Sequence, residues 1–389
     1  MQLVAYGAQD IYLTGNPQIT FFKVVYRRHT NFSMESIQQT WNGQETSDGR
    51  CTATISRNGD LVSRLFIEMS ASSTSNHVNP GTSWINTVEL EIGGQMIDRH
   101  SGRFMEAFYE LTEPNPGGLT SHLGVKDSNG QGTTFQNMSG AGGTSSKGDL
   151  SHMFIPLNFW FCRNPGLALP LIALQYHEVK VVLDQKYAQV FTAGTRTNKL
   201  WADYIYLDTD ERRRFAQVSH EYLIEQVQEQ TLGNENTFNL NFNHPVKELI
   251  WTSSQPSDTT AGSDGYTALK SPLDSLDATV HLKLNGHDRF AERDGKYFSR
   301  TQIWQYHTGP GGLESTSDAT EGAHNDSICV YSFALKPEEH QPSGTCNFSR
   351  IDSAQIISSG KFTAESVIFA INYNVLRIMS GMGGLAYSN

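Results

Sequence analysis

The chain has 389 residues, of which 38% are hydrophobic, 11% aromatic and 18% charged, and its formal net charge at pH 7 is −11. This length allows about two domains, and the aromatic content is typical of packed cores rather than of disordered chains. The excess of acidic residues argues against a protein whose whole surface binds nucleic acid, because such binding requires a basic surface that displaces counterions.

The cysteines argue against a protein stabilised by disulfides or zinc, and the apolar runs argue against a transmembrane protein. The four cysteines are far apart and no two form a CxxC pair, so we expect neither a disulfide framework nor a zinc–thiolate site. The same cysteine usage predicts a protein of a reducing compartment. The first residues lack the pattern of a signal peptide. The longest apolar runs reach about eight residues, whereas a membrane-spanning helix needs about 20, so we expect no transmembrane segment.

The apolar segments predict an all-β protein, because most are short, alternate with polar residues and are bounded by Gly, Asn, Asp or Pro. In chain order, we expect strands over residues 32–41, 61–69 and 88–92, and helices over residues 102–111 and 208–215.

Three dipeptides predict the turns of β-hairpins, because their residues tolerate positive φ angles. They are Asn58-Gly59, Gly93-Gly94 and Asn285-Gly286. Residues 112–149 and 309–326 are rich in Gly, Ser, Thr and Asn and poor in strand signals, which predicts two long loops that serve as interaction surfaces.

The sequence also contains a weak internal repeat. The six residues from Leu90 resemble those from Leu282, and the five from Ser101 resemble those from Asp294. Other matches in the same order pair residues 36–39 with 223–226, 62–67 with 246–251, 164–166 with 341–344, and 204–206 with 369–371. We therefore predict two copies of one domain, each a closed sandwich of two sheets. The expected divisions are an N-terminal segment (1–30), a first domain (31–210), a linker (211–220) and a second domain (221–389).

Residue chemistry indicates no active site, so we expect no enzymatic activity, no bound metal and no cofactor. His281, His287 and His307 lack the spacing of metal ligands. Residues 140–148 resemble a phosphate-binding loop but lack its Gly-Lys-Ser/Thr order, and no Gly-x-Ser-x-Gly sequence is present. The neighbouring Glu338, Glu339 and His340 are interpreted as a solvated turn.

Basic clusters and glycosylation sequons provide the remaining candidates. Arg27-Arg28-His29 is a candidate interaction surface, whereas residues 212–214 lie beside acidic residues and predict a salt-bridged junction. Of four Asn-x-Ser/Thr sequons, those of Asn137 and Asn325 fall in the long loops, which makes these two residues the candidate glycosylation sites.

Four long blocks of the sequence resemble the major capsid proteins of nucleocytoplasmic large DNA viruses. The first runs from Leu3 to Phe32, LVAYGAQDIYLTGNPQITFFKVVYRRHTNF, and the others are residues 282–290, 331–350 and 369–388. The resemblance implies two tandem eight-stranded antiparallel jelly rolls with short helices and long loops. It further implies a homotrimer that forms a pseudo-hexagonal capsomer and tiles an icosahedral shell.

The resemblance also implies partners and an orientation. The partners would be neighbouring capsomers and minor capsid and penton proteins, with no direct contact to nucleic acid. The two long loops would face outward, and Lys23, Arg27 and Arg28 would make contacts at the inner face. The expected location is the virion, assembled in the host cytoplasm. The repeat alone also permits an alternative function, that of a jelly-roll lectin or glycan-binding surface protein.

Overall fold

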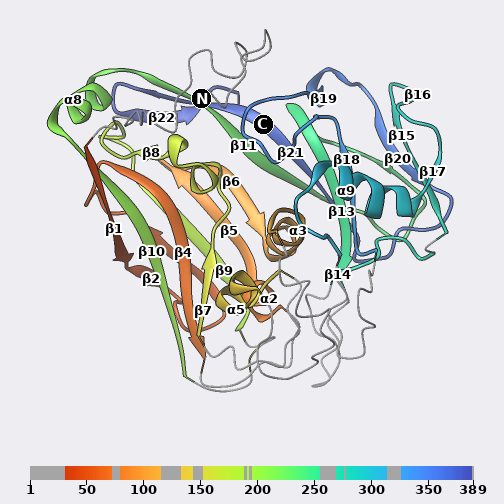
Figure 1. Cartoon of the computed structure of the whole chain (residues 1–389), viewed down its shortest axis with the longest axis horizontal. Helices are drawn as coiled ribbons and strands as arrows, with labels where there is room; N and C mark the ends of the chain where they lie inside the picture. Colours follow the sequence, from red (N-terminus) through yellow and green to blue (C-terminus); the bar gives the residue numbers. More distant parts are fainter. Residues whose placement is uncertain are drawn as a thin grey trace, which may run out of the picture.

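The computed structural model describes residues 31–71, 79–114, 133–142, 152–187, 191, 195–254, 269–275, 277–312 and 326–387. Figure 1 shows two β-rich halves side by side, the first coloured red to green and the second green to blue.

The first half contains two antiparallel sheets. Its strands are β1 (Phe32–Gln39), β2 (Trp41–Gly43), β3 (Gly49–Thr54), β4 (Leu61–Ala71), β5 (Ile85–Ile92), β6 (Gln95–Ser101), β7 (His152–Pro156), β8 (Leu169–Pro170), β9 (Val179–Gln185) and β10 (Arg196–Leu207). One sheet has the order β1-β10-β4-β7, with β8 also pairing with β4, and the other has the order β2-β3-β9-β5-β6. The helices are α2 (Pro80–Ser83), α3 (Gly102–Thr112), α5 (Thr134–Ser139), α6 (Trp160–Arg163) and the 3-10 turn η1 (Pro165–Leu167).

The second half follows helix α8 (Thr209–Gln217) and has the same plan. Its strands are β11 (His220–Thr231), β12 (Thr237–Asn239), β13 (Pro245–Ser254), β14 (Leu269–Lys270), β15 (Thr279–Leu284), β16 (His287–Asp288), β17 (Arg293–Asp294), β18 (Ile328–Ser332), β19 (Cys346–Asn347), β20 (Ala354–Ser358), β21 (Val367–Met379) and β22 (Met382–Leu385). One sheet has the order β11-β21-β13-β14, with β18, β19 and β22 as additional partners, and the other has the order β12-β20-β15-β16, with β17 beside β15. The helical segments are the π-helical turn η2 (Tyr297–Thr301), α9 (Gln302–Tyr306) and the 3-10 turn η3 (Phe348–Arg350).

This strand order confirms the predicted all-β fold of two tandem jelly rolls. β1-β10-β4-β7 in the first half corresponds to β11-β21-β13-β18 in the second. The match of residues 204–206 with 369–371 relates the correct strands, β10 and β21, but the wrong residues. Val62 pairs with Tyr204, whereas its counterpart Val246 pairs with Asn372, so Tyr204 corresponds to Asn372 and not to Phe369. The predicted closure is wrong: each half is two separate stacked sheets, because the described edge strands of one sheet do not pair with those of the other.

Two of the three predicted hairpins are confirmed. Gly93-Gly94 joins β5 to β6 and Asn285-Gly286 joins β15 to β16, and all four residues have φ between 52° and 82°. The third prediction is wrong, because Asn58-Gly59 lies between β3 and β4, which belong to different sheets. Gly59 serves close packing instead, since a Cβ atom there would lie 2.8 Å from the Cβ of Tyr204.

Alternating residues of the facing sheets fill a core in each half. In the first half, Leu65 and Ile67 of β4 belong to one buried cluster with Val88 and Leu90 of β5. In the second half, the corresponding residues are Leu249 and Trp251 of β13, packed with Val280 and Leu282 of β15. Residues that the sequence repeat matches therefore face the core in both halves.

The two halves are joined by apolar packing. Helix α3 of the first half shares a third buried cluster with strands β13, β18 and β21 of the second half. In the opposite direction, Leu376 and Ile378 of β21 belong to the core of the first half. The two helices predicted over residues 102–111 and 208–215 are confirmed as α3 and α8. The limits of the four expected divisions stay predictions. The described helices include none long and apolar enough to span a membrane.

Candidate functional site

Helix α3 occupies the junction of the two halves. The side chain of Ser101 caps it by accepting a hydrogen bond from the backbone amide of Phe104, at 3.3 Å. Gly102 permits a close approach, because a Cβ atom there would lie 2.4 Å from the carbonyl oxygen of Ile85. Phe104 packs edge-on against Phe369 of the second half, with ring centroids 5.4 Å apart. The helix is thus a fixed element between two sheets.

Two buried glutamates on α3 hold the bases of the two long loops. One oxygen of Glu106 accepts a hydrogen bond from the amide of Gly142 at 2.8 Å, and the other accepts one from the hydroxyl of Thr82 at 2.8 Å. Glu110 accepts a hydrogen bond from the amide of Gly312 at 3.0 Å. Hydrogen bonds to a carboxylate are among the stronger ones, so one helix anchors both loops.

Backbone hydrogen bonds complete this anchoring. The amide of Gly309 donates to the carbonyl of Leu111 at 2.8 Å, and the amide of Gly311 donates to the carbonyl of Glu110 at 2.9 Å. The hydroxyl of Thr308 donates to the carbonyl of Thr112 at 2.9 Å. The chain therefore leaves for residues 313–325 from a point beside the end of α3.

The predicted site residues are only partly within the described residues. Asn137 lies exposed on helix α5, and Ser139 of its sequon is buried and donates a hydrogen bond to the carbonyl of Phe135. Asn325, Lys23, Arg27 and Arg28 lie outside the described residues, as do most of the loops at 112–149 and 309–326. The structure thus places one of the five candidates, on a helix rather than in an irregular loop.

One ion pair crosses the junction, and its carboxylate, which is 3% exposed, forms a second ion pair within the second half. Arg163 of α6 lies 2.7 Å from the carboxylate of Glu225 on β11, and Lys247 of β13 lies 2.8 Å from the same carboxylate. Burial raises the pKa of Glu225, but Arg163 and Lys247 outweigh it and hold that pKa well below its usual range. His340 lies 3.6 Å from Glu225, so one carboxylate faces three basic groups from both halves.

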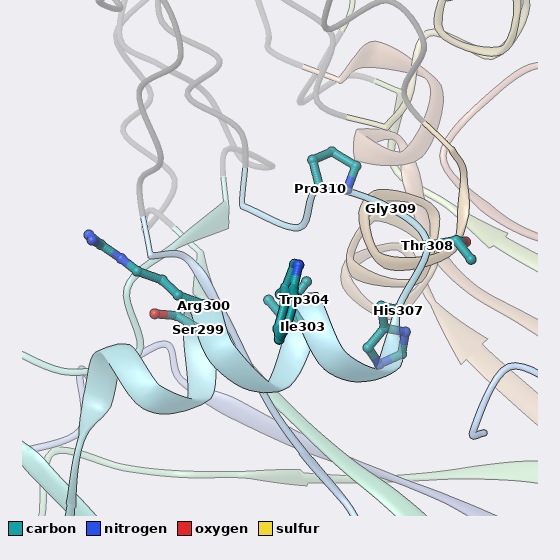
Figure 2. A pocket seen from close by; sticks show the side chains of 8 residues that line it. All are labelled: Ser299, Arg300, Ile303, Trp304, His307, Thr308, Gly309 and Pro310. Atoms are coloured by element: carbon teal, nitrogen blue, oxygen red, sulfur yellow. The ribbon is translucent and has the colours of Figure 1, made fainter. Parts of the chain in front are cut away.

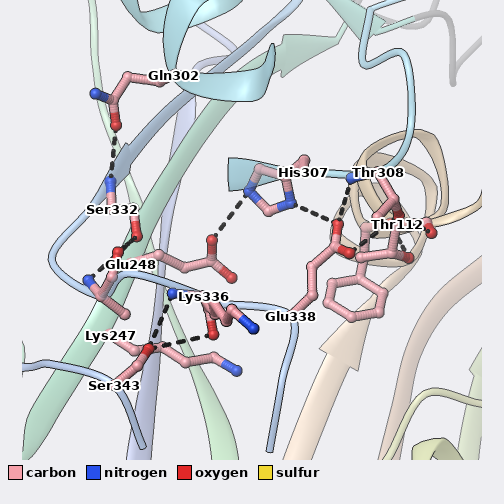
Figure 3. A network of polar contacts seen from close by, with 12 residues as sticks. Thr112, Lys247, Glu248, Gln302, His307, Thr308, Ser332, Lys336, Glu338 and Ser343 are labelled. Atoms are coloured by element: carbon pink, nitrogen blue, oxygen red, sulfur yellow. Dashed lines mark hydrogen bonds and ion pairs between the residues drawn. The ribbon is translucent and has the colours of Figure 1, made fainter. Parts of the chain in front are cut away.

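His307, which directly follows helix α9, forms a second buried charged group, as Figure 3 shows. Its Nε2 lies 3.1 Å from Glu248 and its Nδ1 lies 3.1 Å from Glu338. Burial lowers the pKa of His307, but the two carboxylates outweigh it and raise that pKa to about 9. The imidazole is therefore protonated at neutral pH. Glu338 also accepts a hydrogen bond from the amide of Thr308, at 2.8 Å, so it is not the solvated residue that the sequence indicated.

A hollow lies beside helix α9 and the segment that directly follows it, as Figure 2 shows. Trp304 stands in it with 81% of its surface exposed, which is unusual for this residue type. The residues that line the hollow are Ser299, Arg300, Ile303, Trp304, His307, Thr308, Gly309 and Pro310. Arg300 makes a two-pronged ion pair with Asp326, at 2.8 and 2.6 Å.

The sequence did not reveal Glu106, Glu110 or the partners of His307. A carboxylate in an amphipathic helix is ordinarily placed on the solvent side. At about 100° per residue, Glu106 and Glu110 are centred about 100° around the helix from Met105 and Tyr109, so the helical pattern gave no signal that the two glutamates are buried. Among the described residues, no group of three or more His, Cys, Asp or Glu side chains could hold a metal ion.

Comparisons with known proteins cover nearly the whole chain. Residues 20–208 match a family described as "Major capsid protein N-terminus", and residues 211–384 match one described as "Large eukaryotic DNA virus major capsid protein". The chain is 51% identical to the major capsid protein of Pyramimonas orientalis virus, over 100% of this chain and 99% of that protein. It is 39% identical to that of Paramecium bursaria Chlorella virus 1, with the same coverage.

Solved structures show the same likeness. A quasi-atomic structure of the PBCV-1 virus capsid matches with a TM-score of 0.76 and 35% identity, covering 95% of this chain and 100% of that chain. The Faustovirus major capsid protein matches in fold, with a TM-score of 0.66 and 13% identity over 96% of this chain and 94% of that chain.

Proposed function

The chain belongs to the major capsid proteins of large eukaryotic DNA viruses and is a structural component of the virion shell, and we propose how its copies assemble. In this proposal, three copies of the chain form one capsomer. The arrangement of two rolls with the same strand order side by side in one chain carries the proposal. Three copies then present six similar rolls around a threefold axis, which gives a nearly hexagonal tile under a simple closed symmetry. The alternative of a jelly-roll lectin is set aside, because the full-length relatives are capsid proteins.

Light scattering on the purified chain tests this proposal. A trimer has three times the mass of the 43.3 kDa chain, and electron microscopy of the same sample should show six-lobed particles. A single-chain mass at every concentration would overturn the proposal. The relatives are structural proteins, which is consistent with the expectation of no enzymatic activity.

We propose that the end of the molecule that carries α2 and α5 faces outward. These helices lie at the end opposite α8 and β22 in Figure 1. The anchoring of residues 142 and 312 to α3 supports this orientation, because it brings described ends of both long loops to one helix. Antibodies against peptides from residues 115–132 should bind intact particles, whereas binding only after particle disruption would contradict the orientation.

The opposite end is proposed to contact minor capsid proteins through Lys23, Arg27 and Arg28. These residues precede β1, whose first residue Phe32 pairs with Leu207 next to α8. Replacing the three basic residues by glutamate should leave the trimer mass unchanged and abolish co-assembly with minor capsid proteins. Retained co-assembly would contradict this role.

The proposal has three further parts. The first is that Asn137 and Asn325 carry glycans. The second is that penton proteins and neighbouring capsomers contact the trimer, and the third is that assembly takes place in the host cytoplasm. The exposure of Asn137 supports the first part. Intact-mass measurement on the virion protein tests it, since Asn137→Gln and Asn325→Gln should each remove one glycan mass. Immunolabelling of infected cells tests the place of assembly.

A further inference from the structure

The repeat relates two surfaces, one covered and one uncovered. In the second half, the outer side of the sheet presents Ile250 of β13, Phe369 of β21 and Ile328 of β18, all fully buried. Helix α3 of the first half covers them, and all three share its buried cluster. This covered pair of surfaces is the junction described above.

In the first half, no element among the described residues covers the same side of the corresponding sheet. Counting from the matched Val62 and Val246, Ile250 corresponds to Phe66, and the strand registers then relate Phe369 to Trp201 and Ile328 to Phe154. These three residues form an aromatic group, which we call the aromatic face. Phe66 and Trp201 stack with centroids 6.2 Å apart, and Phe66 and Phe154 lie 6.3 Å apart. Phe154 is 36% exposed, and Phe66 and Trp201 are half-buried.

The second half likewise has a helix in the place of α3, formed by η2 and α9. The match of Ser101–Met105 with residues 294–298 relates the inward residues Met105 and Tyr109 to Phe298 and Gln302, and all four are buried. The residues of α3 that cover the neighbouring half are Phe104, Ala107, Phe108 and Leu111. Their counterparts are Tyr297, Arg300, Thr301 and Trp304, which we call the helix face.

The helix face is uncovered where its counterpart is buried. Leu111 is fully buried under the second half, whereas its counterpart Trp304 is 81% exposed. Arg300 is exposed, and Tyr297 and Thr301 are half-buried. Exposed or half-buried aromatic residues, such as Trp304 on the helix face and the three residues of the aromatic face, have the composition of the anchors that dominate protein–protein interfaces.

We propose that the helix face of one copy docks on the aromatic face of a second copy of this chain, in the way α3 docks on the second half within one chain. The inference rests on the proposed trimer and names the surfaces that hold it together. The two faces differ, so the contact is head-to-tail and closes into a ring when the third copy meets the first. Each copy contributes its helix face to one neighbour and its aromatic face to the other.

Two variants separate this inference from the trimer itself. Trp304→Asp alters only the helix face and Phe154→Asp only the aromatic face, and both side chains are exposed enough to leave folding intact, as circular dichroism will verify. Each variant should raise the concentration at which the trimer half-dissociates at least about tenfold, measured by light scattering. Tyr176→Ala, with a 75% exposed side chain outside both faces, is the matched control and should leave the mass unchanged.

Mixing the two variants tests the pairing directly. An equimolar mixture should form two-chain particles that do not close, because one chain retains its helix face and the other its aromatic face. If the unsubstituted chain and both variants form trimers equally well, the inference about the two faces is overturned, whereas the proposed trimer is supported. Dissociated variants that form no pair on mixing would overturn the pairing of these two faces, and a monomeric unsubstituted chain would overturn the trimer as well.

Discussion

Replacing Glu225 by glutamine tests whether the charges at the junction stabilise the protein. The carboxylate lies 2.7 Å from Arg163 and 2.8 Å from Lys247, and its side chain is 3% exposed. Lys247 is 1% exposed, so a neutral amide at position 225 removes the partner of an ammonium group that cannot reach water.

The expected loss follows from this burial. Removing one partner of a buried ion pair costs about 3–5 kcal/mol, because the remaining charge is left without compensation. For a unit of 150–250 residues, each kcal/mol lowers the melting temperature by about 2–4 °C, so we expect a decrease of about 6–20 °C. Thermal unfolding at pH 7, followed by circular dichroism, measures it.

The same strand provides a matched control. Glu221 on β11 pairs with Arg377 at 2.9 Å, but the two side chains are 60% and 51% exposed. Glu221→Gln should therefore cost less than about 1 kcal/mol. Equal effects of the two substitutions, or an unchanged melting temperature for Glu225→Gln, would refute the reasoning that burial sets the cost.

A double variant tests whether the loss of stability comes from the lost attraction or from the buried charge that is left without a partner. The double variant Glu225→Leu with Lys247→Met removes both buried charges and keeps apolar volume. It should recover much of the stability that Glu225→Gln loses, because no isolated ammonium group remains. A double variant that is less stable than Glu225→Gln would contradict this explanation.

Three further predictions concern other sites. The raised pKa of His307 means that its charge stabilises the fold fully below about pH 6.5, and that about 3 kcal/mol is lost as pH rises to about 9; urea unfolding across this range should show the loss, and His307→Gln should abolish it. Gly81→Ala should cost about 1–3 kcal/mol, because the new Cβ would lie 1.9 Å from the carbonyl oxygen of Ser139; an unchanged urea midpoint would disprove the close contact. Asn285→Val should cost at least about 1–2 kcal/mol, because φ is 52° there, and an unaltered stability would show that the hairpin tolerates a β-branched residue.

The local chemistry of the hairpins made part of the fold predictable. Gly93-Gly94 and Asn285-Gly286 predicted their turns because the left-handed backbone conformation is a property of the residues themselves. Asn58-Gly59 carries the same signal, but its glycine serves packing against Tyr204, which is distant in sequence. A dipeptide cannot distinguish these two uses of glycine.

The polar contacts of the site were less predictable because their partners are far apart in the chain. Glu110 binds the amide of Gly312, and Arg163 binds Glu225, and nothing near either residue marks the partner. His307 shows the same difficulty, since its burial depends on Glu248 and Glu338. The repeat was the exception, because it relates distant residues through sequence similarity.

The anchoring of two loops to one helix has a consequence for how this shell can diversify. Glu106 holds one end of the first loop at Gly142, and Glu110 holds one end of the second loop at Gly312. Lengthening either loop costs little free energy, since doubling a flexible loop adds only about 0.6 kcal/mol of closure entropy. The outline of the tile depends on the sheets and helices, which such insertions leave unchanged. On the outward orientation proposed above, relatives can therefore vary the exterior of the particle while they keep the same tile.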